Sequence, residues 1–178
     1  MVKVFVGVLI VTFVVVIGFM IVDPEIPNTN TNAITEVYND PSVKFSIEGE
    51  VYKAGTYTLK DNATMYDLIE AAGGLTAIAD ERSYFDSATL SKGQTYYIGA
   101  LYDANDVCNN KEISKVNINN DDATTLASVN GITSSIANSI VSWRVENGTF
   151  ETIEDLLDVY GIGTATYRKI RNYVILHE

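Results

Sequence analysis

The sequence is short of the residues on which most catalytic and metal sites depend. Its 178 residues include one cysteine, Cys108, and one histidine, His177, next to the C-terminal residue. One cysteine excludes an internal disulfide, and the sequence contains no Cys/His spacing typical of a zinc site. It also shows no nucleophile–base arrangement. We therefore predict no enzymatic activity, no cofactor and no metal site.

Basic residues are also scarce, which bears on the choice of partner. The chain has 12 Lys and Arg residues against 23 Asp and Glu, giving a net charge of −11. Residues 24–112 carry −8 of this and residues 113–178 carry −3. An acidic balance argues against a nucleic-acid partner on overall electrostatics. Exposed charges are screened over about 8 Å at physiological salt, however, so the local geometry of a site counts for more than distant charge.

Proline occurs three times, always within residues 24–43. This stretch, PEIPNTNTNAITEVYNDPSV, is rich in Asn and Thr and too poor in apolar residues to bury a core. We interpret residues 24–43 as a flexible linker, which as a coil would span roughly 25 Å.

Charge is absent from one long stretch near the N-terminus, VFVGVLIVTFVVVIGFMIV at residues 4–22. As a helix it would reach about 28 Å, close to the thickness of a bilayer core. A cleavable signal peptide is the alternative, but its apolar region is shorter and a small-residue cleavage site should follow. We predict a single transmembrane anchor within residues 1–23. Because Lys3 precedes the run and Asp23 follows it, the N-terminus is expected in the cytoplasm and the remaining chain outside the cell membrane.

Residues 44–108 indicate a small domain of mixed elements. VKFSIEGEVY and AGTYTLK alternate apolar and polar residues, which predicts two strands with a turn at Ala54 and Gly55. Thr64 is expected to cap a helix over MYDLIEAAGGL that ends at the glycine pair, and SKGQTYYIGA supplies a last strand. Two strands, a helix across them and a further strand suggest a β-grasp-like α+β unit.

This domain resembles the soluble-ligand-binding β-grasp (SLBB) pattern through IEGEVYKAGTYTL, AAGGLT and LSKGQTYYI. Ala54 replaces the proline that usually precedes the turn glycine. The resemblance implies ligand binding or self-association. The aromatic residues of the domain form either a sugar or partner surface or, as is more common, strand core: Tyr52, Tyr57, Tyr66, Tyr84, Phe85, Tyr96 and Tyr97.

Residues 116–176 contain an internal repeat. LASVNGIT at 126–133 aligns with LLDVYGIG at 156–163, a shift of thirty residues. Each copy reads as helix, glycine hairpin and helix, and NGTFETIEDL connects the copies. Two copies can share one apolar core, so residues 113–178 are expected to form an all-α domain.

A glycine hairpin of this kind suits a phosphate group. The first turn of a helix exposes backbone N–H groups that lack helical partners, and it carries the positive end of the helix dipole. An anion can therefore bind there without a charged side chain. Gly161 and Gly163 are expected to supply the positive φ of a tight turn, while Ile162 points inward and fixes the hairpin on the core. Thr164 and Thr166 can add hydroxyl donors.

One such turn is weak evidence, because ordinary turns between helices also contain it, but two copies at a fixed spacing form a stronger signal. The Asn-x-Asn lead-in at Asn117 and the Arg-x-x-x-Gly-x-Phe connector at Arg144 extend the pattern, which resembles tandem helix-hairpin-helix domains. With the apolar run, linker and SLBB-like unit, the chain resembles the ComEA-type competence DNA receptors of Gram-positive bacteria. The resemblance implies non-specific binding of double-stranded DNA outside the membrane. It also implies the DNA-uptake channel and pilus machinery as partners.

The first hairpin departs from the family pattern. Thr133 stands where the third position is usually Gly, and Ser134 and Ser135 follow where Lys is frequent. We therefore expect the first hairpin to be the poorer phosphate site.

Basic residues follow the second hairpin, and they either contact DNA or form a solvated set that complements the helix C-terminus. Contact with about three to five phosphates predicts a slope of about −3 to −4 for log affinity against log salt, and micromolar-class binding. Useful capture would then need several copies. The other basic side chain of this domain is Lys115. The predicted DNA-binding residues are Gly131, Ile132, Thr133, Ser134, Ser135, Arg144, Gly161, Ile162, Gly163, Thr164, Thr166, Arg168, Lys169 and Arg171.

Two other functions stay open from the sequence. The chain could be a surface polysaccharide-binding or export component that acts through the SLBB-like domain, which would leave the tandem hairpins unexplained. It could also be an accessory domain of a repair-type enzyme, which the outward-facing anchor disfavours.

Overall fold

The computed structural model describes residues 42–103 and 111–178, which belong to one compact unit, Asn39–Glu178. The predicted anchor at residues 4–22, most of the predicted linker, and Cys108 lie outside the described residues. Across the two described ranges, no helix is both long enough and apolar enough to cross a bilayer.

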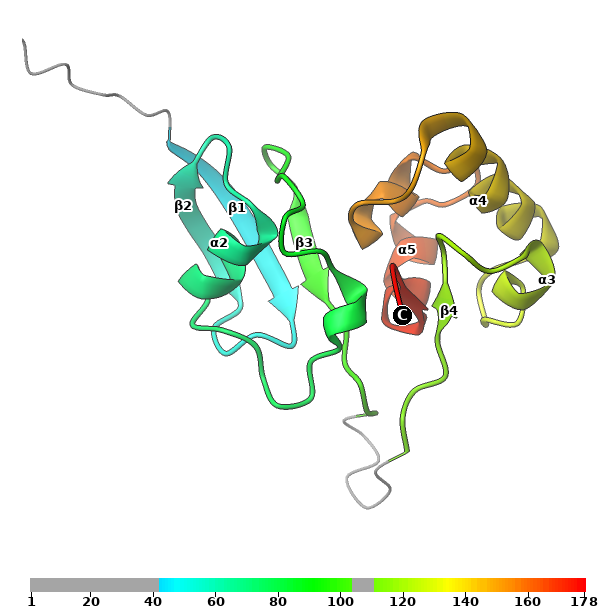
Figure 1. Ribbon diagram of the computed structural model, residues 1–178, viewed down its shortest axis with the longest axis horizontal. Helices are drawn as coiled ribbons and strands as arrows, with labels where there is room; N and C mark the ends of the chain where they lie inside the picture. The colour runs from blue at the N-terminus through cyan, green and yellow to red at the C-terminus, as the bar shows by residue number, and fades with distance from the viewer. Residues whose placement is uncertain (1–41, 104–110) are drawn as a thin grey trace, which may run out of the picture. The chain divides into compact units, whose positions relative to one another are not determined.

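The first part of the described chain is a mixed three-stranded sheet with a helix against one face (Figure 1). Strand β1 (Ser42–Gly49) pairs antiparallel with β2 (Gly55–Lys60) and parallel with β3 (Thr95–Ile98). The strand order is β2-β1-β3, so β3 is an edge strand of this sheet. Helix α2 (Met65–Ala71) crosses β1 and β2. The β-grasp-like arrangement predicted from the sequence is confirmed.

Helix α2 begins where the sequence predicts. Thr64 and Asp67 form a capping box: the Asp67 N–H donates to Thr64 Oγ1 at 3.4 Å, and the Thr64 N–H donates to Asp67 Oδ2 at 2.8 Å. The apolar stripe of the helix, including Met65 and Leu68, is buried against the sheet. Of the aromatic residues in this domain, Tyr84 and Tyr96 belong to the core, whereas Tyr52 and Tyr66 are exposed.

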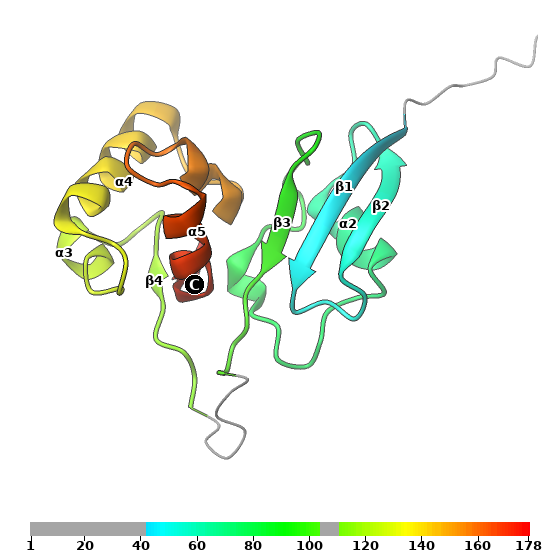
Figure 2. The same ribbon diagram turned by 180° about the vertical axis from the view of Figure 1, so that it is seen from behind.

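The second part of the described chain is a group of short helices (Figure 2), and it carries its own hydrophobic core. The first copy of the repeat supplies α3 (Ala123–Leu126) and α4 (Ser134–Asn147). The second copy supplies η2 (Ile153–Asp158) and α5 (Thr164–Ile170), and the short η3 (Arg171–Tyr173) follows. The helix–hairpin–helix order is therefore present twice.

The all-α prediction for this domain is wrong in two details. Two short strands, β4 (Val116–Asn117) and β5 (Val174–Ile175), pair in parallel and join the beginning of the domain to its end. The first helix of the second copy, η2, is a 3-10 helix rather than an α-helix. Two-residue strands are too short to show the alternation that identifies a strand in a sequence.

The lead-in and connector residues of the repeat hold this domain together. The Asn119 side-chain amide donates to the carbonyls of Phe150 and Leu176 at 3.0 Å, and its Oδ1 accepts from the Phe150 N–H at 2.8 Å. The Phe150 ring is stacked on Trp143 with centroids 4.1 Å apart. These residues tie the connector to the C-terminal end of the chain.

Candidate nucleic-acid interface

The two hairpins have the same backbone hydrogen bonds, as the repeat predicts. In the first, the Ile132 N–H donates to the Val129 carbonyl at 2.9 Å, and in the second the Ile162 N–H donates to the Val159 carbonyl at 3.0 Å. Ile132 and Ile162 are buried in the core of the domain. Both isoleucines therefore anchor their hairpins, and a contact with DNA through their side chains would require them to leave the core.

The turn glycines have different roles. Gly131 and Gly161 have φ of +118° and +92°, a region that favours glycine. The expectation of positive φ at Gly163 is wrong, because its φ is −94°. Thr133 has nearly the same extended backbone at the matching position, with φ −75° and ψ 162°. A Cβ atom at Gly163 would meet no neighbouring atom. The fold therefore does not require glycine at position 163. The absence of a side chain there leaves the start of α5 uncovered.

The beginnings of α4 and α5 differ in their caps. Thr133 Oγ1 accepts a hydrogen bond from the Ile136 N–H at 3.3 Å, which satisfies one donor at the start of α4. Gly163 offers no such acceptor, and in the described part of the chain no side chain caps α5. The first N–H groups of α5 therefore stay available to an external acceptor. This difference supports the expectation that the first hairpin is the poorer phosphate site.

Each hairpin lies against the second helix of the other copy. A Cβ atom at Gly131 would be 3.0 Å from Ile170 in α5, and one at Gly161 would be 3.6 Å from Ile136 in α4. Lys169 in α5 donates from Nζ to Oδ1 of Asn130 in the first hairpin at 2.9 Å. Each hairpin thus contacts the second helix of the other copy, and the two form one continuous surface. The predicted site residues that are exposed on it are Thr133, Ser134, Ser135, Gly161, Gly163, Thr164, Arg168 and Lys169.

The predicted basic residues do not all belong to this surface. Arg168 and Lys169 are exposed beside the second hairpin. Arg171 pairs with Glu48 Oε2 in β1 at 3.0 Å, and its guanidinium lies 3.9 Å from the centroid of the Tyr97 ring. Arg144 donates to two carbonyls within its own domain, those of Ile118 at 2.8 Å and Asp121 at 2.6 Å. DNA contact by Arg144 and Arg171 stays a prediction, and both already have protein partners.

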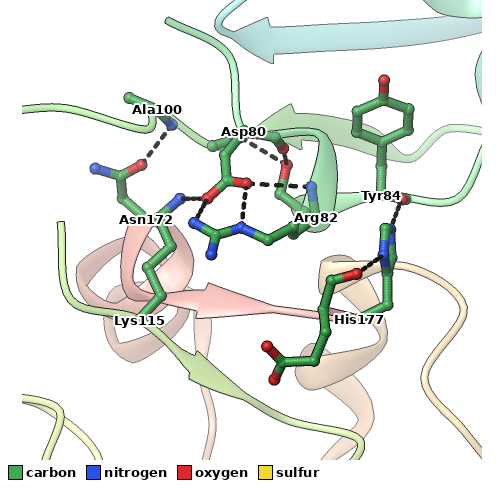
Figure 3. A network of polar contacts seen from close by, with 10 residues as sticks. Asp80, Arg82, Tyr84, Ala100, Lys115, Asn172 and His177 are labelled. Atoms are coloured by element: carbon green, nitrogen blue, oxygen red, sulfur yellow. Dashed lines mark hydrogen bonds and ion pairs between the residues drawn. The ribbon is translucent and has the colours of Figure 1, made fainter. Parts of the chain in front are cut away.

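Lys115 has a purely internal partner (Figure 3). Its Nζ lies 2.8 Å from Asp80 Oδ2, and its side chain is 1% exposed. Asp80 also accepts from Arg82 in η1 (Glu81–Ser83), at 2.8 Å from Nε. Burial opposes ionisation of Asp80, but the hydrogen bonds from Arg82 and Lys115 outweigh it and lower the carboxyl pKa to about 2. Burial lowers the pKa of Lys115.

Two residues, one in this surface and one buried beneath it, escaped the sequence analysis. Tyr160, directly before Gly161, is 88% exposed, whereas the first copy has Asn130 at that position. Glu154 in η2 is buried and contacts α5 through Tyr167. The position of Tyr160, directly before a turn glycine, is a sequence signal that could have predicted an exposed aromatic ring at the hairpin. Nothing in the sequence distinguishes Glu154 from the exposed acids around it.

Comparison with known proteins identifies the two domains. The SLBB domain family matches residues 44–93, and the helix-hairpin-helix motif family matches residues 111–175. Over 167 residues the chain is 29% identical to ComE operon protein 1 of Bacillus subtilis (strain 168), a match that covers 86% of this chain and 82% of the relative.

Other similarities are restricted to part of the chain. Over 60 residues it is 43% identical to endonuclease/exonuclease/phosphatase family domain-containing protein 1 of Bos taurus, covering 34% of this chain and 10% of that protein. Over 62 residues it is 42% identical to an uncharacterized protein of Haemophilus influenzae, covering 34% and 55%.

An SLBB domain followed by a tandem helix-hairpin-helix domain defines the class of protein to which this fold and surface correspond. Together with the similarity over most of its length, this domain order supports a ComEA-type competence DNA receptor. The family and the helix-hairpin-helix domain support DNA binding in competence.

Proposed function

We propose that this protein captures double-stranded DNA outside the cell membrane, through the backbone amides of its two hairpins and without sequence preference. The observation that carries the proposal is the pair of matching hairpins that pack into one surface. Backbone amides bind phosphate oxygens, which are the same in every sequence, so such a surface positions DNA without reading its bases.

The second hairpin is the main phosphate site of this proposal. Its helix begins uncapped, and Arg168 and Lys169 are exposed in the same helix. The first hairpin contributes less, because Thr133 already occupies one of its donors. Since Arg144, Arg171 and Lys115 are partly or fully covered by their partners within the protein, we expect a salt slope of about −2 to −3, shallower than the basic residue count predicts.

Anchoring is proposed on the sequence of residues 4–22, and it would hold the receptor at the outer face of the membrane. Several weakly binding copies on one duplex would gain avidity from being confined to that surface. The SLBB domain is the candidate for self-association. The DNA-uptake channel and pilus machinery would then receive the captured DNA.

The test is a salt titration of the full chain against two unrelated duplexes of equal length. The key variant is Gly163→Asp, because aspartate is a favourable N-cap that would occupy the free amides and repel phosphate while leaving the helix stable. Thr149→Asp adds the same charge at an exposed connector position, beyond the opposite end of α4 from its hairpin.

Equal affinity for both duplexes, reduced by about tenfold in Gly163→Asp and little changed in Thr149→Asp, is the expected result. Absence of DNA binding at low salt would contradict the proposal. A glycan panel in the same experiment tests polysaccharide binding by the SLBB domain. If glycans bind and DNA does not, polysaccharide binding becomes the leading function.

A further inference from the structure

We propose that Glu154 is a positioning residue for the DNA-binding surface, and that its buried carboxyl group couples the second hairpin to strand β3 of the SLBB domain. Docking of the SLBB domain and binding of DNA then strengthen each other. This inference rests on the proposed DNA-binding function.

Glu154 joins three elements through one oxygen atom. It lies in η2 and is 2% exposed. Its Oε1 accepts from the Tyr167 hydroxyl in α5 at 2.6 Å and from the Tyr97 N–H in β3 at 2.8 Å. Because η2 precedes the second hairpin and α5 follows it, the bond to Tyr167 closes the base of that hairpin.

The contact with β3 uses the edge of the sheet. Unpaired N–H groups of an edge strand need acceptors from elsewhere, and here the helix-hairpin-helix domain supplies them. Glu154 accepts from Tyr97, and Asn172 Oδ1 accepts from the Ala100 N–H just beyond β3 at 2.8 Å (Figure 3). Arg171 adds its ion pair with Glu48. The second copy of the repeat and η3, which follows it, therefore supply these three contacts.

The first copy has no equivalent of this bond. At the repeat shift of thirty residues, Thr124 matches Glu154 and Ala137 matches Tyr167, and Thr124 is exposed. The first hairpin therefore lacks a buried acceptor at its base. The hairpin that begins with an uncapped helix is the one fixed to the SLBB domain.

The charge state of Glu154 gives this coupling a measurable property. Within the described residues, its Oε2 has no hydrogen-bond partner. Burial raises the pKa of Glu154 to about 7, although the hydrogen bond from Tyr167 opposes the rise. The groups that act on it are the Tyr167 hydroxyl from α5, the Tyr97 N–H and the Tyr96 side chain from β3, and Asp155 from its own element. Arg171 from η3 acts on Tyr167.

The direction of the pH dependence follows from this raised pKa. The assembled state holds the proton of Glu154 more tightly than a state in which the carboxyl meets water, where its ordinary pKa is 4.5. Assembly is therefore most favourable when Glu154 is protonated, and it weakens as the pH rises from about 4.5 through about 7. We expect DNA affinity to fall by roughly three- to tenfold between about pH 6 and about pH 8.

The experiment measures DNA affinity of the full chain at both pH values for matched variants. Glu154→Gln keeps an acceptor oxygen and removes the ionisation, so its affinity should no longer depend on pH in this range. Tyr167→Phe removes the donor from α5 and should lower affinity at both pH values. Glu151→Gln, at an exposed connector position, and His177→Gln, which removes the single histidine, should keep the dependence of the original protein.

A second readout needs no DNA. Trp143 is the single tryptophan of the chain and lines the same cleft of about 560 Å³ as Glu154. Its fluorescence should titrate with a midpoint near pH 7 in the original protein and lose that transition in Glu154→Gln. Absence of DNA binding by the original protein at every pH would overturn the DNA-binding function. The fluorescence titration would still show whether Glu154 controls the pH-dependent change.

Two results would overturn the coupling itself. One is a pH dependence of DNA affinity that survives in Glu154→Gln and disappears in His177→Gln. The other is an unchanged fluorescence titration in Glu154→Gln together with unchanged DNA affinity in Tyr167→Phe.

Discussion

Arg168 and Arg171 lie close together in the sequence but have different surroundings. Arg168 is exposed on the hairpin surface. Arg171 contacts Glu48 and the Tyr97 ring, partners that lie 123 and 74 residues earlier in the chain. A partner so distant in sequence leaves no local pattern, so residue type by itself cannot separate a free cation from an engaged one.

Replacing these two arginines should therefore have different effects. Arg168→Ala should reduce the salt slope of DNA binding by about 1, because one phosphate contact is lost. Arg171→Ala should leave the slope nearly unchanged and lower the free energy of unfolding by about 1 kcal/mol, the usual size of a partly exposed ion pair with a cation–π contact. Salt titrations and urea unfolding measure both. Equal changes of slope in the two variants would contradict this assignment.

Lys115 provides a second prediction for a single residue. Lys115→Met should lower the free energy of unfolding at neutral pH by roughly 3 kcal/mol, because Asp80 loses one partner of a buried pair. The lowered pKa of Asp80 stabilises the fold above the ordinary value of 3.8, and that contribution is lost as the pH falls through about 2. In the variant, acid unfolding should begin at a higher pH. Urea unfolding across this pH range measures it, and an unshifted acid transition would count against the role of the pair.

The helix beginnings show what the sequence could predict among the elements. Thr64 and Asp67 form the predicted cap of α2, because a capping pattern involves residues only three apart. The repeat likewise predicted both hairpins. Strands β4 and β5 were missed because they are two residues long and pair with segments far away in sequence.

The cap of α4 allows a test of the two hairpins against each other. Thr133→Gly would give the first hairpin the uncapped start that Gly163 gives the second. We expect a loss of only a few tenths of a kcal/mol in stability, because glycine is a tolerable N-cap, and a gain in DNA affinity of about two- to fivefold from the freed amide. Urea unfolding and DNA titration measure the two quantities. A fall in affinity would show that the Thr133 hydroxyl itself contacts DNA.

In the whole molecule, polar contacts connect two hydrophobic cores, and Phe85 packs against both. One core lies in the SLBB domain and the other in the helix-hairpin-helix domain. Between them are several side-chain contacts to residues of the SLBB domain, among them those of Glu154, Asn172, Lys115 and Arg171. The sequence predicted the two domains but not their connection, because each of these bonds depends on one side chain meeting one distant backbone or side-chain group.

The unfolding cooperativity of the chain should depend on the polar contacts between the two cores. Cores joined by intact polar contacts unfold in one transition, and probes of either core then report the same midpoint. Trp143 fluorescence reports the helix-hairpin-helix core, and hydrogen exchange of the paired β1 and β2 amides reports the SLBB core. The double variant Asn172→Ala, Lys115→Met leaves the Ala100 N–H and the Asp80 carboxylate with fewer partners, so the two midpoints should separate in urea.

A control, Asn147→Ala, removes an exposed amide within α4 and should keep the two midpoints coincident. If the double variant lost stability with both midpoints still coincident, the two cores would be coupled by contacts other than these.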